Sequence, residues 1–506
     1  MSDTREAELL EQIHRLQMEN MLLRQKLDAL AGRLFGRKSE QLNDAQMHLL
    51  LQELDAPGPA RGNGLSPEAI ETEPPRQRKV SGKSRGPRVP EHLPVIEEII
   101  VPEEVKLAPQ AWRQMGEEVS EQLDYEPARF IRRRIVRPKY VRRQEIDAVP
   151  VIAPLPQSLQ ERCLAAPGLI AQILVGKYCD HLPLYRQESI HWSRHGVWLP
   201  RQSLARWVAL AADWLRPIYE VIRTGVMGGG YVQIDETPIK YLEPGHGQTR
   251  QGYLWVCHRP GNDVVFHWQT SRAATCLEKI IPVDFCGTIQ CDGYSAYPAF
   301  ANRHSQPITL AGCWAHARRA FYEARQESPR LMSWILRQIQ HLYAVEKQLR
   351  ERRAGPRLRQ AARSHQSQPI ITRLHKALVA LKTSRRFLPN SLAGKAIDYA
   401  LGQWNELSVY LADGRVEIDN NLVENAIRPT AIGKKNWLFI GEANAGERSA
   451  IIYTIIESCR RRSIDPYAYL RDVLTQLPSA TNWQIKDLTP EVWAKSQRSA
   501  SLLRAA

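Results

Sequence analysis

Two aspartates in the middle of the chain each follow a short apolar segment that is typical of a β-strand. Asp235 ends the segment YVQID, and Asp292 directly follows GTIQC. Each aspartate alone is more often a turn or helix-cap residue, so the prediction depends on the pair. Two carboxylates at neighbouring strand ends repel each other, and a hard divalent cation is the usual compensation. Oxygen ligands suit Mg²⁺ or Mn²⁺, and two such ions can hold the attacking and leaving oxygens of a phosphoryl displacement.

A third carboxylate that could complete this site lies in the segment DNNLVENAIRP. Asp419 can cap a helix, and a spacing of four residues places Asn420, Glu424 and Arg428 on one helix face. We expect Glu424 to point at the metal ions, with Asn420 and Arg428 supporting the site. The alternative is a salt bridge between Glu424 and Arg428 on a solvated face. We expect Pro429 to end the helix.

The elements around these acids must bring them together. Residues 231–234, 251–259 and 262–269 are typical of three consecutive antiparallel strands, and helices and strands then alternate to about residue 324. This is the element order of a ribonuclease-H-like mixed α/β sheet. The first and fourth strands of such a sheet would bring Asp235 and Asp292 side by side.

The stretch from 326 to 412 separates Asp292 from Glu424, and its pattern is helical and basic. We interpret it as an insertion before the last catalytic helix. It either shapes a channel for DNA or serves as a structural spacer. Beyond the helix that carries Glu424, we expect Lys434 and Lys435 to hold phosphates, as Arg428 would.

Composition limits the partner of this site. The 506 residues include 69 Lys+Arg and 54 Asp+Glu, a formal net charge of +15, which favours nucleic acid or an anionic membrane surface. No run of 18 uncharged apolar residues exists, and the charged N-terminus lacks a secretion signal. The eight cysteines are scattered without a C-x-x-C motif, which is typical of a reducing cytosol. We expect a cytoplasmic protein without a membrane partner that acts on a polyanion.

Two basic stretches precede the predicted core. The linker at 52–95 is rich in Pro and Gly, and it is a solvated tether, an arm that contacts phosphates, or both. Residues 129–143 hold eight Lys and Arg and no acid, within a region, 96–150, that resembles short strands. The residues that we expect to contact phosphate there are Arg132, Arg133 and Arg134.

A helical region follows, in which Gly196 and Pro200 separate two helices. This pattern is typical of a helix-turn-helix, although many helical hairpins of this kind bind nothing. The residues expected to enter a DNA groove are Arg201, Gln202 and Arg206. Those expected to face the core are Leu204, Trp207 and Val208.

The first residues form a heptad repeat that predicts a two-stranded coiled coil. Seven of the eight seam positions are apolar, and the exception, Asn20, would pair with its own copy and favour a homodimer. The alternative is a single amphipathic helix packed on its own core. The seam residues are Leu9, Ile13, Leu16, Asn20, Leu23, Leu27, Leu30 and Leu34.

Several motifs in one order resemble a known family. YVQIDETPIK, QCDGYSAY, GCWAHARRAF and DNNLVENAIRP are similar to the bacterial DDE transposases of the insertion-sequence-66 family, specifically their large transposase C protein. KYCDHLPLYRQ and LFGRKSEQL are similar to further segments of that family, so the resemblance runs from the zipper to about residue 475. It implies that Asp235, Asp292 and Glu424 are the catalytic, metal-binding triad of a ribonuclease-H-like core. It also implies that Cys313 and His316 support the active site without holding zinc.

The same resemblance implies a function and partners. Such an enzyme binds the terminal inverted repeats of its element, cleaves their 3′ ends with metal ions and transfers the strands to target DNA. It would act as a homodimer or a higher synaptic assembly at the bacterial nucleoid, and relatives generally act with two small accessory proteins of the same element.

The predicted parts, in order, are a leucine-zipper coiled coil (1–51), a basic linker (52–95), a degenerate zinc-ribbon-like β-unit (96–150), a helix-turn-helix DNA-binding region (151–226), the first part of the core (227–325), a helical insertion (326–412), the last part of the core with C-terminal helices (413–475) and a tail (476–506).

The sequence departs from the family in the ribbon. Relatives carry a cysteine pair there, whereas 96–150 holds no cysteine, and structural zinc needs about four N or S ligands. We therefore expect no structural zinc and a ribbon packed around Trp112 and Phe130. The remaining candidate zinc ligands are Cys286, Cys291, Cys313 and His316. Their spacing is poor, and Cys291 adjoins the catalytic Asp292.

Two other functions compete with the transposase. The first is a catalytically silent or repurposed DNA-binding protein derived from a transposase, which the degenerate ribbon suggests and the three retained acids argue against. The second is another ribonuclease-H-like nuclease, such as a junction resolvase. Resolvases lack a long zipper and a separate helix-turn-helix in one chain, and they do not join a 3′ end to new DNA.

The zipper generates a prediction about assembly. Replacing Asn20 with Leu removes the polar seam position that fixes register, so Asn20→Leu is expected to loosen the preference for dimers. Light scattering of the purified full-length protein measures this directly. An unchanged mass distribution would count against the seam.

Overall fold

The structure is a computed structural model of the 506-residue chain. The residues that it describes are 89, 91, 93–126, 129–142, 149–243, 245 and 247–505. The predicted zipper at 1–51 and most of the predicted linker at 52–95 lie outside them. None of the helices in this described part is long and apolar enough to cross a membrane.

A long β-hairpin dominates the first sheet. Strands β2 (Trp112–Glu126) and β3 (Arg129–Arg142) pair antiparallel, and β1 (Val95–Ile99) and β4 (Val151–Ile152) both pair with β3. The helix α3 (Glu103–Leu107) and the 3-10 turn η2 (Pro109–Ala111) connect β1 to β2. The prediction of short strands is wrong for the hairpin, whose strands have 15 and 14 residues. Acidic positions of β2 lie opposite basic positions of β3, and such cross-strand pairs stabilise the extended pairing.

The two aromatic residues expected to hold the ribbon together lie at opposite ends of this hairpin. Trp112 begins β2, whereas Phe130 pairs with Tyr125 beside the turn. Both rings are buried, but they do not pack on one another. The buried ring of Phe130 instead makes edge contacts with Tyr125 and with two histidines of the following helical region, His191 and His195.

Three helices follow the hairpin. They are α4 (Pro167–Tyr178), α5 (Leu184–His195) and α6 (Arg201–Met227). Gly196 ends α5 in the left-handed conformation, with φ of 64°, and Pro200 precedes α6, as the sequence predicts. The residues predicted to face the core are buried: Leu204, Trp207 and Val208. Those predicted to face DNA are exposed: Arg201, Gln202 and Arg206.

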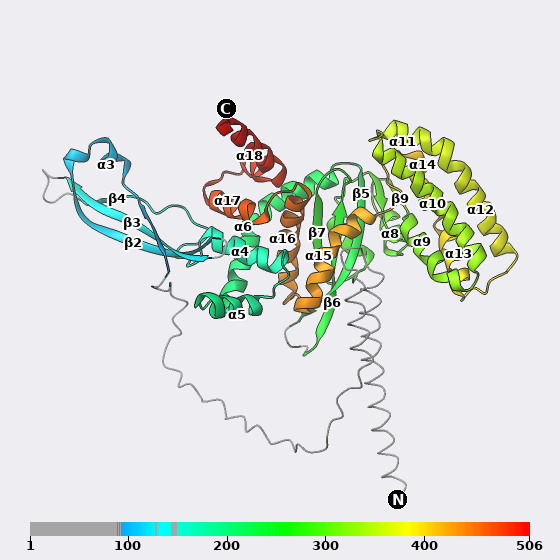
Figure 1. Ribbon diagram of the computed structural model, residues 1–506, viewed down its shortest axis with the longest axis horizontal. Coiled ribbons are helices and arrows are strands. Elements are labelled where there is room, and N and C mark those ends of the chain that lie inside the picture. Colours follow the sequence, from blue (N-terminus) through cyan, green and yellow to red (C-terminus); the bar gives the residue numbers. More distant parts are fainter. Residues whose placement is uncertain are drawn as a thin grey trace, which may run out of the picture. The chain divides into compact units, whose positions relative to one another are not determined.

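A five-stranded mixed sheet carries the predicted site (Figure 1). Its strands are β5 (Tyr231–Leu242), β6 (Thr249–His258), β7 (Val264–Gln269), β8 (Gly287–Gln290) and β9 (Ile308–Ala311). They lie in the order β7-β6-β5-β8-β9, in which β5, β6 and β7 are antiparallel and β8 and β9 run parallel to β5. Helices α7 (Ala274–Ile280) and α8 (Ala296–Ala301) connect the parallel strands. Parallel pairing with β5 sets the end of β8, at Gln290, beside Gln233 in the first half of β5.

Helices from distant parts of the chain pack on this sheet. Helix α15 (Asn421–Trp437) contacts β5 and β6, and α16 (Ala443–Arg461) packs with α6 against β7. Within the predicted C-terminal tail at 476–506, the described residues form η5 (Leu477–Ser479), η6 (Ile485–Leu488) and α18 (Pro490–Ala505) after α17 (Pro466–Gln476). Buried apolar side chains explain why this segment is folded, because Ile485 and Leu488 belong to the main hydrophobic core.

The stretch predicted as a helical insertion is helical and has a core of its own (Figure 1). After α9 (Trp314–Glu323) and η3 (Ala324–Gln326) come α10 (Pro329–Glu351), α11 (Pro356–Ala362), the π-helical turn η4 (Arg363–Ser367), α12 (Gln368–Thr383), α13 (Leu392–Gly402) and α14 (Trp404–Ala412). Arg363 and Glu346 form an ion pair inside this unit, and neither side chain is exposed. The chain then returns to the sheet through 413–420.

Candidate active site

The two predicted aspartates lie on neighbouring strands, with Asp292 just beyond the end of β8 and Asp235 within β5. The prediction that the first strand ends at Asp235 is wrong, because β5 continues to Leu242 and stays paired with β6. Gln233 on β5 is in register with Gln290 on β8, and Asp235 and Asp292 each lie two residues further along. Both side chains are half-buried. The backbone N–H of Glu236 donates to Asp235 Oδ1 at 2.9 Å, which orients that carboxyl. The pairing therefore brings together two acids that are 57 residues apart in sequence. Their neighbours Gln233 and Gln290, which are in register, have the same separation.

The third predicted acid is on α15, which packs against β5. The Asp419 carboxylate accepts the backbone N–H of Asn421 at 3.2 Å at the start of this helix, and Glu424 lies within its first turn. The prediction that Pro429 ends the helix is wrong, because α15 continues to Trp437. Residues beyond the proline are buried against the core, and the Thr430 hydroxyl donates to a carbonyl in the preceding turn. These contacts compensate for the hydrogen bond that a proline removes.

A buried pair of glutamines fixes the approach to that helix. Gln233 Nε2 donates to the Asp419 carbonyl and to Gln290 Oε1, each at 2.9 Å, and Gln290 Nε2 donates to the Glu417 carbonyl at 2.8 Å. The Tyr231 hydroxyl donates to Gln290 Oε1 at 2.6 Å and accepts the Glu417 N–H at 3.0 Å. Both glutamines are completely buried. Strands β5 and β8 thus bind the segment that positions Glu424.

The sequence interpretation missed this glutamine pair, although a signal was present. Each glutamine lies two residues before a predicted catalytic aspartate, in Gln233-Ile-Asp235 and Gln290-Cys-Asp292. Residues two apart on a strand lie on the same face. A polar residue repeated at that spacing in two apolar strands therefore indicates a shared polar contact beside the acids.

A second buried acid beside Asp235 is already neutralised. The side chain of Glu236 is 1% exposed, accepts the Tyr297 hydroxyl at 2.9 Å and pairs with Arg272. The Arg272 guanidinium also lies 3.7 Å from Asp292 Oδ2 and stacks on the Tyr294 ring, with its carbon 3.7 Å from the ring centroid. The sequence interpretation singled out neither Glu236 nor Arg272. Arg272 therefore places one fixed positive charge beside Glu236 and Asp292.

The electrostatics of the three predicted acids fit a divalent cation. Burial, and after it the nearby charges of Glu236, Glu424 and Asp292, raise the pKa of Asp235 to about 8. Glu424 Oε1 is buried and has no hydrogen-bond partner among the described residues. Crowded carboxylates with an unpaired oxygen are suited to a hard cation with oxygen ligands. Asp235, Asp292 and Glu424 are therefore the residues that could hold Mg²⁺ or Mn²⁺.

The predicted supporting residues also gather around Glu424. Cys313 precedes α9, and its thiol donates to Asn420 Oδ1 at 2.9 Å. His316 Nε2 lies 3.8 Å from Glu424 Oε1. One ligand atom each of Cys313, His316 and Glu424 lies within 4.8 Å of the others, a mixed donor set that could also hold a metal ion. Burial raises the pKa of Cys313 to about 12, which favours the thiol over the thiolate that ligates metal.

The predicted phosphate-binding residues of α15 differ in their surroundings. Lys434 Nζ donates to the Thr237 hydroxyl at 3.2 Å and to the Pro238 carbonyl at 3.3 Å, so it is tied to β5. Lys435 and Arg428 are exposed. The imidazole of His316 lies within ion-pair distance of Glu424, and no described ion pair joins Glu424 to Arg428. Arg428 and Lys435 are therefore the two that solvent or a ligand reaches freely.

The predicted phosphate-binding arginines of the hairpin have acidic partners. Arg132 and Arg134 both pair with Glu121, at 2.8 and 3.2 Å, and Arg133 pairs with Glu98 at 2.8 Å. The acid-free run in the sequence is therefore balanced by acids on the neighbouring strands. Phosphate would have to compete with these glutamates for the arginines.

Comparison with known proteins identifies the family. A family model described as "Transposase IS66 family" matches residues 162–448, which include all three acids. The chain belongs to the IS66 transposase family. The models "IS66 C-terminal element" and "Transposase C of IS166 homeodomain" match residues 454–490 and 22–97. The family predicted from the sequence motifs is thus confirmed.

Relatives of similar length extend this IS66 assignment over the chain. The uncharacterized protein y4jD of Sinorhizobium fredii is 32% identical over 96% of this chain and 97% of its own length. The uncharacterized protein y4qI of the same organism is 34% identical over 90% of this chain and 85% of its own. The similarity therefore covers the region of the site and the elements that flank it.

The crowded acids generate a prediction about stability. Without divalent cations, Asp235→Asn is expected to raise the melting temperature by about 1–2 °C, because about 1 kcal/mol shifts a domain of 150–250 residues by about 2–4 °C and a larger one by less. The pKa of Asp235 rises from 3.8 to about 8 on folding, so the destabilisation in the wild type appears as the pH increases between these values. The gain in melting temperature should be absent near pH 4 and largest above pH 8. Calorimetry in the presence of a chelator measures it.

The matched control for this measurement is Asp284→Asn, which changes an exposed aspartate. It should leave the melting temperature unchanged across the same pH range. A gain for Asp235→Asn that does not vary with pH would contradict the electrostatic origin.

Proposed function

We propose that this chain is a DNA transposase with a ribonuclease-H-like core that cleaves the 3′ ends of its element and joins them to target DNA. The observation that carries the proposal is the convergence of Asp235, Asp292 and Glu424 from two neighbouring strands and one helix. Membership of the IS66 transposase family supports it. The strand order, three antiparallel strands followed by two parallel ones, supports the ribonuclease-H-like assignment.

Asp235, Asp292 and Glu424 would hold the divalent ions. Bound there, such ions supply Lewis-acid stabilisation of the phosphoryl oxygens and lower the pKa of a water molecule. Before they bind, the raised pKa of Asp235 keeps a proton on its carboxyl at neutral pH, which limits repulsion among the acids. Arg272 orients the Asp292 side of the site through its ion pair and its stacking on Tyr294.

The same arrangement serves two chemically similar steps. In the first, water attacks the phosphorus, the bond to the 3′ oxygen breaks, and a 3′-hydroxyl and a 5′-phosphate result. In the second, that 3′-hydroxyl oxygen attacks a phosphorus of target DNA and displaces another 3′ oxygen. Both are in-line displacements that need no covalent enzyme intermediate. Arg428 and Lys435, which are exposed on the helix of Glu424, would hold phosphates near the reacting centre.

Other parts of the chain would bring the DNA to this site. The exposed start of α6, with Arg201, Gln202 and Arg206, would contact the terminal inverted repeats in a groove. The zipper at 1–51 would pair two protomers so that two ends are processed together. Accessory proteins of the same element would join this assembly.

Metal-dependent nicking of a terminal-repeat oligonucleotide tests the proposal. Asp235→Asn, Asp292→Asn and Glu424→Gln each remove a carboxylate and are expected to lower the Mg²⁺- or Mn²⁺-dependent rate by at least about 10³-fold. DNA binding in a gel-shift assay should change little, because these side chains hold cations rather than phosphate.

Asp284→Asn is the control, since it removes an exposed aspartate outside the site. If wild type and Asp235→Asn cleave alike, the catalytic assignment fails. If neither cleaves while both bind DNA, the chain is a silent DNA-binding derivative. Joining of a 3′ end to new DNA separates a transposase from a resolvase.

A further inference from the structure

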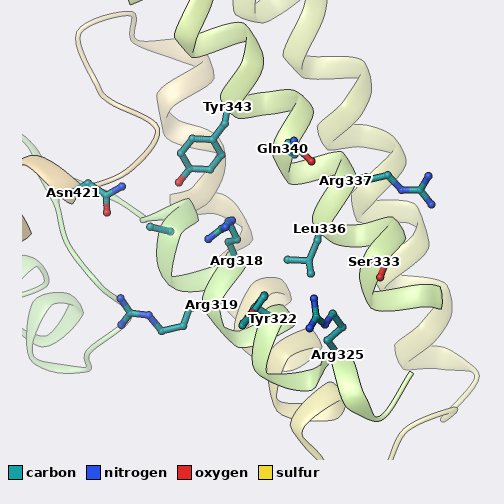
Figure 2. A pocket seen from close by; sticks show the side chains of 11 residues that line it. Arg318, Arg319, Tyr322, Arg325, Ser333, Leu336, Arg337, Gln340, Tyr343 and Asn421 are labelled. Carbon is teal, nitrogen blue, oxygen red and sulfur yellow. The ribbon is translucent and has the colours of Figure 1, made fainter. Parts of the chain in front are cut away.

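A groove with a strong positive charge lies between α9 and α10, beside the site described above. It has a volume of about 730 Å³. Its charged lining residues are Arg318, Arg319, Arg325 and Arg337, and no acid is among its lining residues. Figure 2 shows the arginines of α9 and η3 together with side chains of α10 around this space.

The four arginines are available to a ligand. All four are exposed, and none forms an ion pair with any residue in the described part of the chain. This distinguishes them from the hairpin arginines Arg132, Arg133 and Arg134, which glutamates neutralise. Four unpaired guanidinium groups around one groove create a potential that attracts a polyanion, and guanidinium donors match phosphate geometry.

The groove begins at the active site. Asn421 lines one end of it, next to Asn420 and three residues before Glu424. On α9, His316 faces Glu424, whereas Arg318 and Arg319 line the groove on the same helix. A strand whose phosphate lies at the proposed metal site therefore has a cationic path along the insertion.

The size and the aromatic lining favour one strand over a duplex. About 730 Å³ is the volume of a pocket for a small ligand, in the usual range of about 300–1,000 Å³, and not that of a double helix. Tyr322 is 53% exposed, and the Arg325 guanidinium lies over its ring at 5.0 Å. Cationic grooves with aromatic and guanidinium surfaces on which bases stack are typical of single-strand binding.

We propose that this groove binds a single strand of DNA, the unpaired stretch that adjoins the cleavage point, through its phosphates and without base specificity. The proposal rests on the proposed function for the identity of the polymer. It assigns the insertion a role in holding the strand at the active site.

Binding of a fluorescent 12-residue oligothymidylate by the full-length protein, followed by anisotropy over a salt series, tests this. Arg325→Ala/Arg337→Ala is expected to weaken binding at least tenfold and to reduce the salt slope by about 1.4, from about 0.7 for each lost phosphate contact. Both residues are exposed and lie away from the acids, so the fold and the catalytic residues remain in place.

The matched control is Arg352→Ala/Arg386→Ala, which removes the same charge from exposed arginines of the insertion outside the groove. It should change the affinity less than twofold. If the two double variants lose affinity for the single strand equally, the proposal is overturned. It is also overturned if Arg325→Ala/Arg337→Ala loses as much affinity for a blunt duplex as for the single strand. Because this assay needs no cleavage, absence of nicking would refute the proposed function while leaving this binding result unaffected.

Discussion

The buried contact between Gln233 and Gln290 is the interaction on which the site depends. The two amides bridge adjacent parallel strands and bind the backbone carbonyls of Asp419 and Glu417. A fully buried amide with no partner is unfavourable by about 1–3 kcal/mol, so the strands and the 417–419 segment are held in one arrangement. That arrangement places the helix of Glu424 over the strands of the two aspartates. Positions more than 100 residues apart in sequence are thus brought close together.

The helical insertion also holds the segment at 417–419 in place, through ion pairs. Arg359 binds Glu417 at 2.8 Å and Glu346 at 3.1 Å, and Glu346 forms the fully buried pair with Arg363. Breaking a buried pair by removing one partner is typically unfavourable by about 3–5 kcal/mol, so Glu346 and Arg363 hold the insertion together, and Arg359 joins it to Glu417 in the segment before Glu424. The sequence left open whether the insertion is a channel or a spacer. Its ion pairs join it to Glu417 in the segment before Glu424, and its free arginines are the basis of the proposed strand groove.

Much of the fold is predictable from the sequence because it follows local patterns. The strand order, the end of α5 at Gly196 before α6 and the burial of Trp207 all follow from periodicity and turn residues. Features that depend on distant partners were missed or wrong. Helix α15 continues through Pro429 because tertiary packing outweighs the lost hydrogen bond. Arg272 was missed because its partners, Glu236 and Asp292, come together only in the folded sheet.

A crystal structure of the full-length protein with Mn²⁺, analysed by its anomalous scattering, is the most direct test of the central claim. The account predicts manganese bound by the carboxylates of Asp235, Asp292 and Glu424, and its loss in Asp235→Asn. Manganese bound only at Cys313, His316 and Glu424, or the same occupancy in Asp235→Asn as in the wild type, would contradict it.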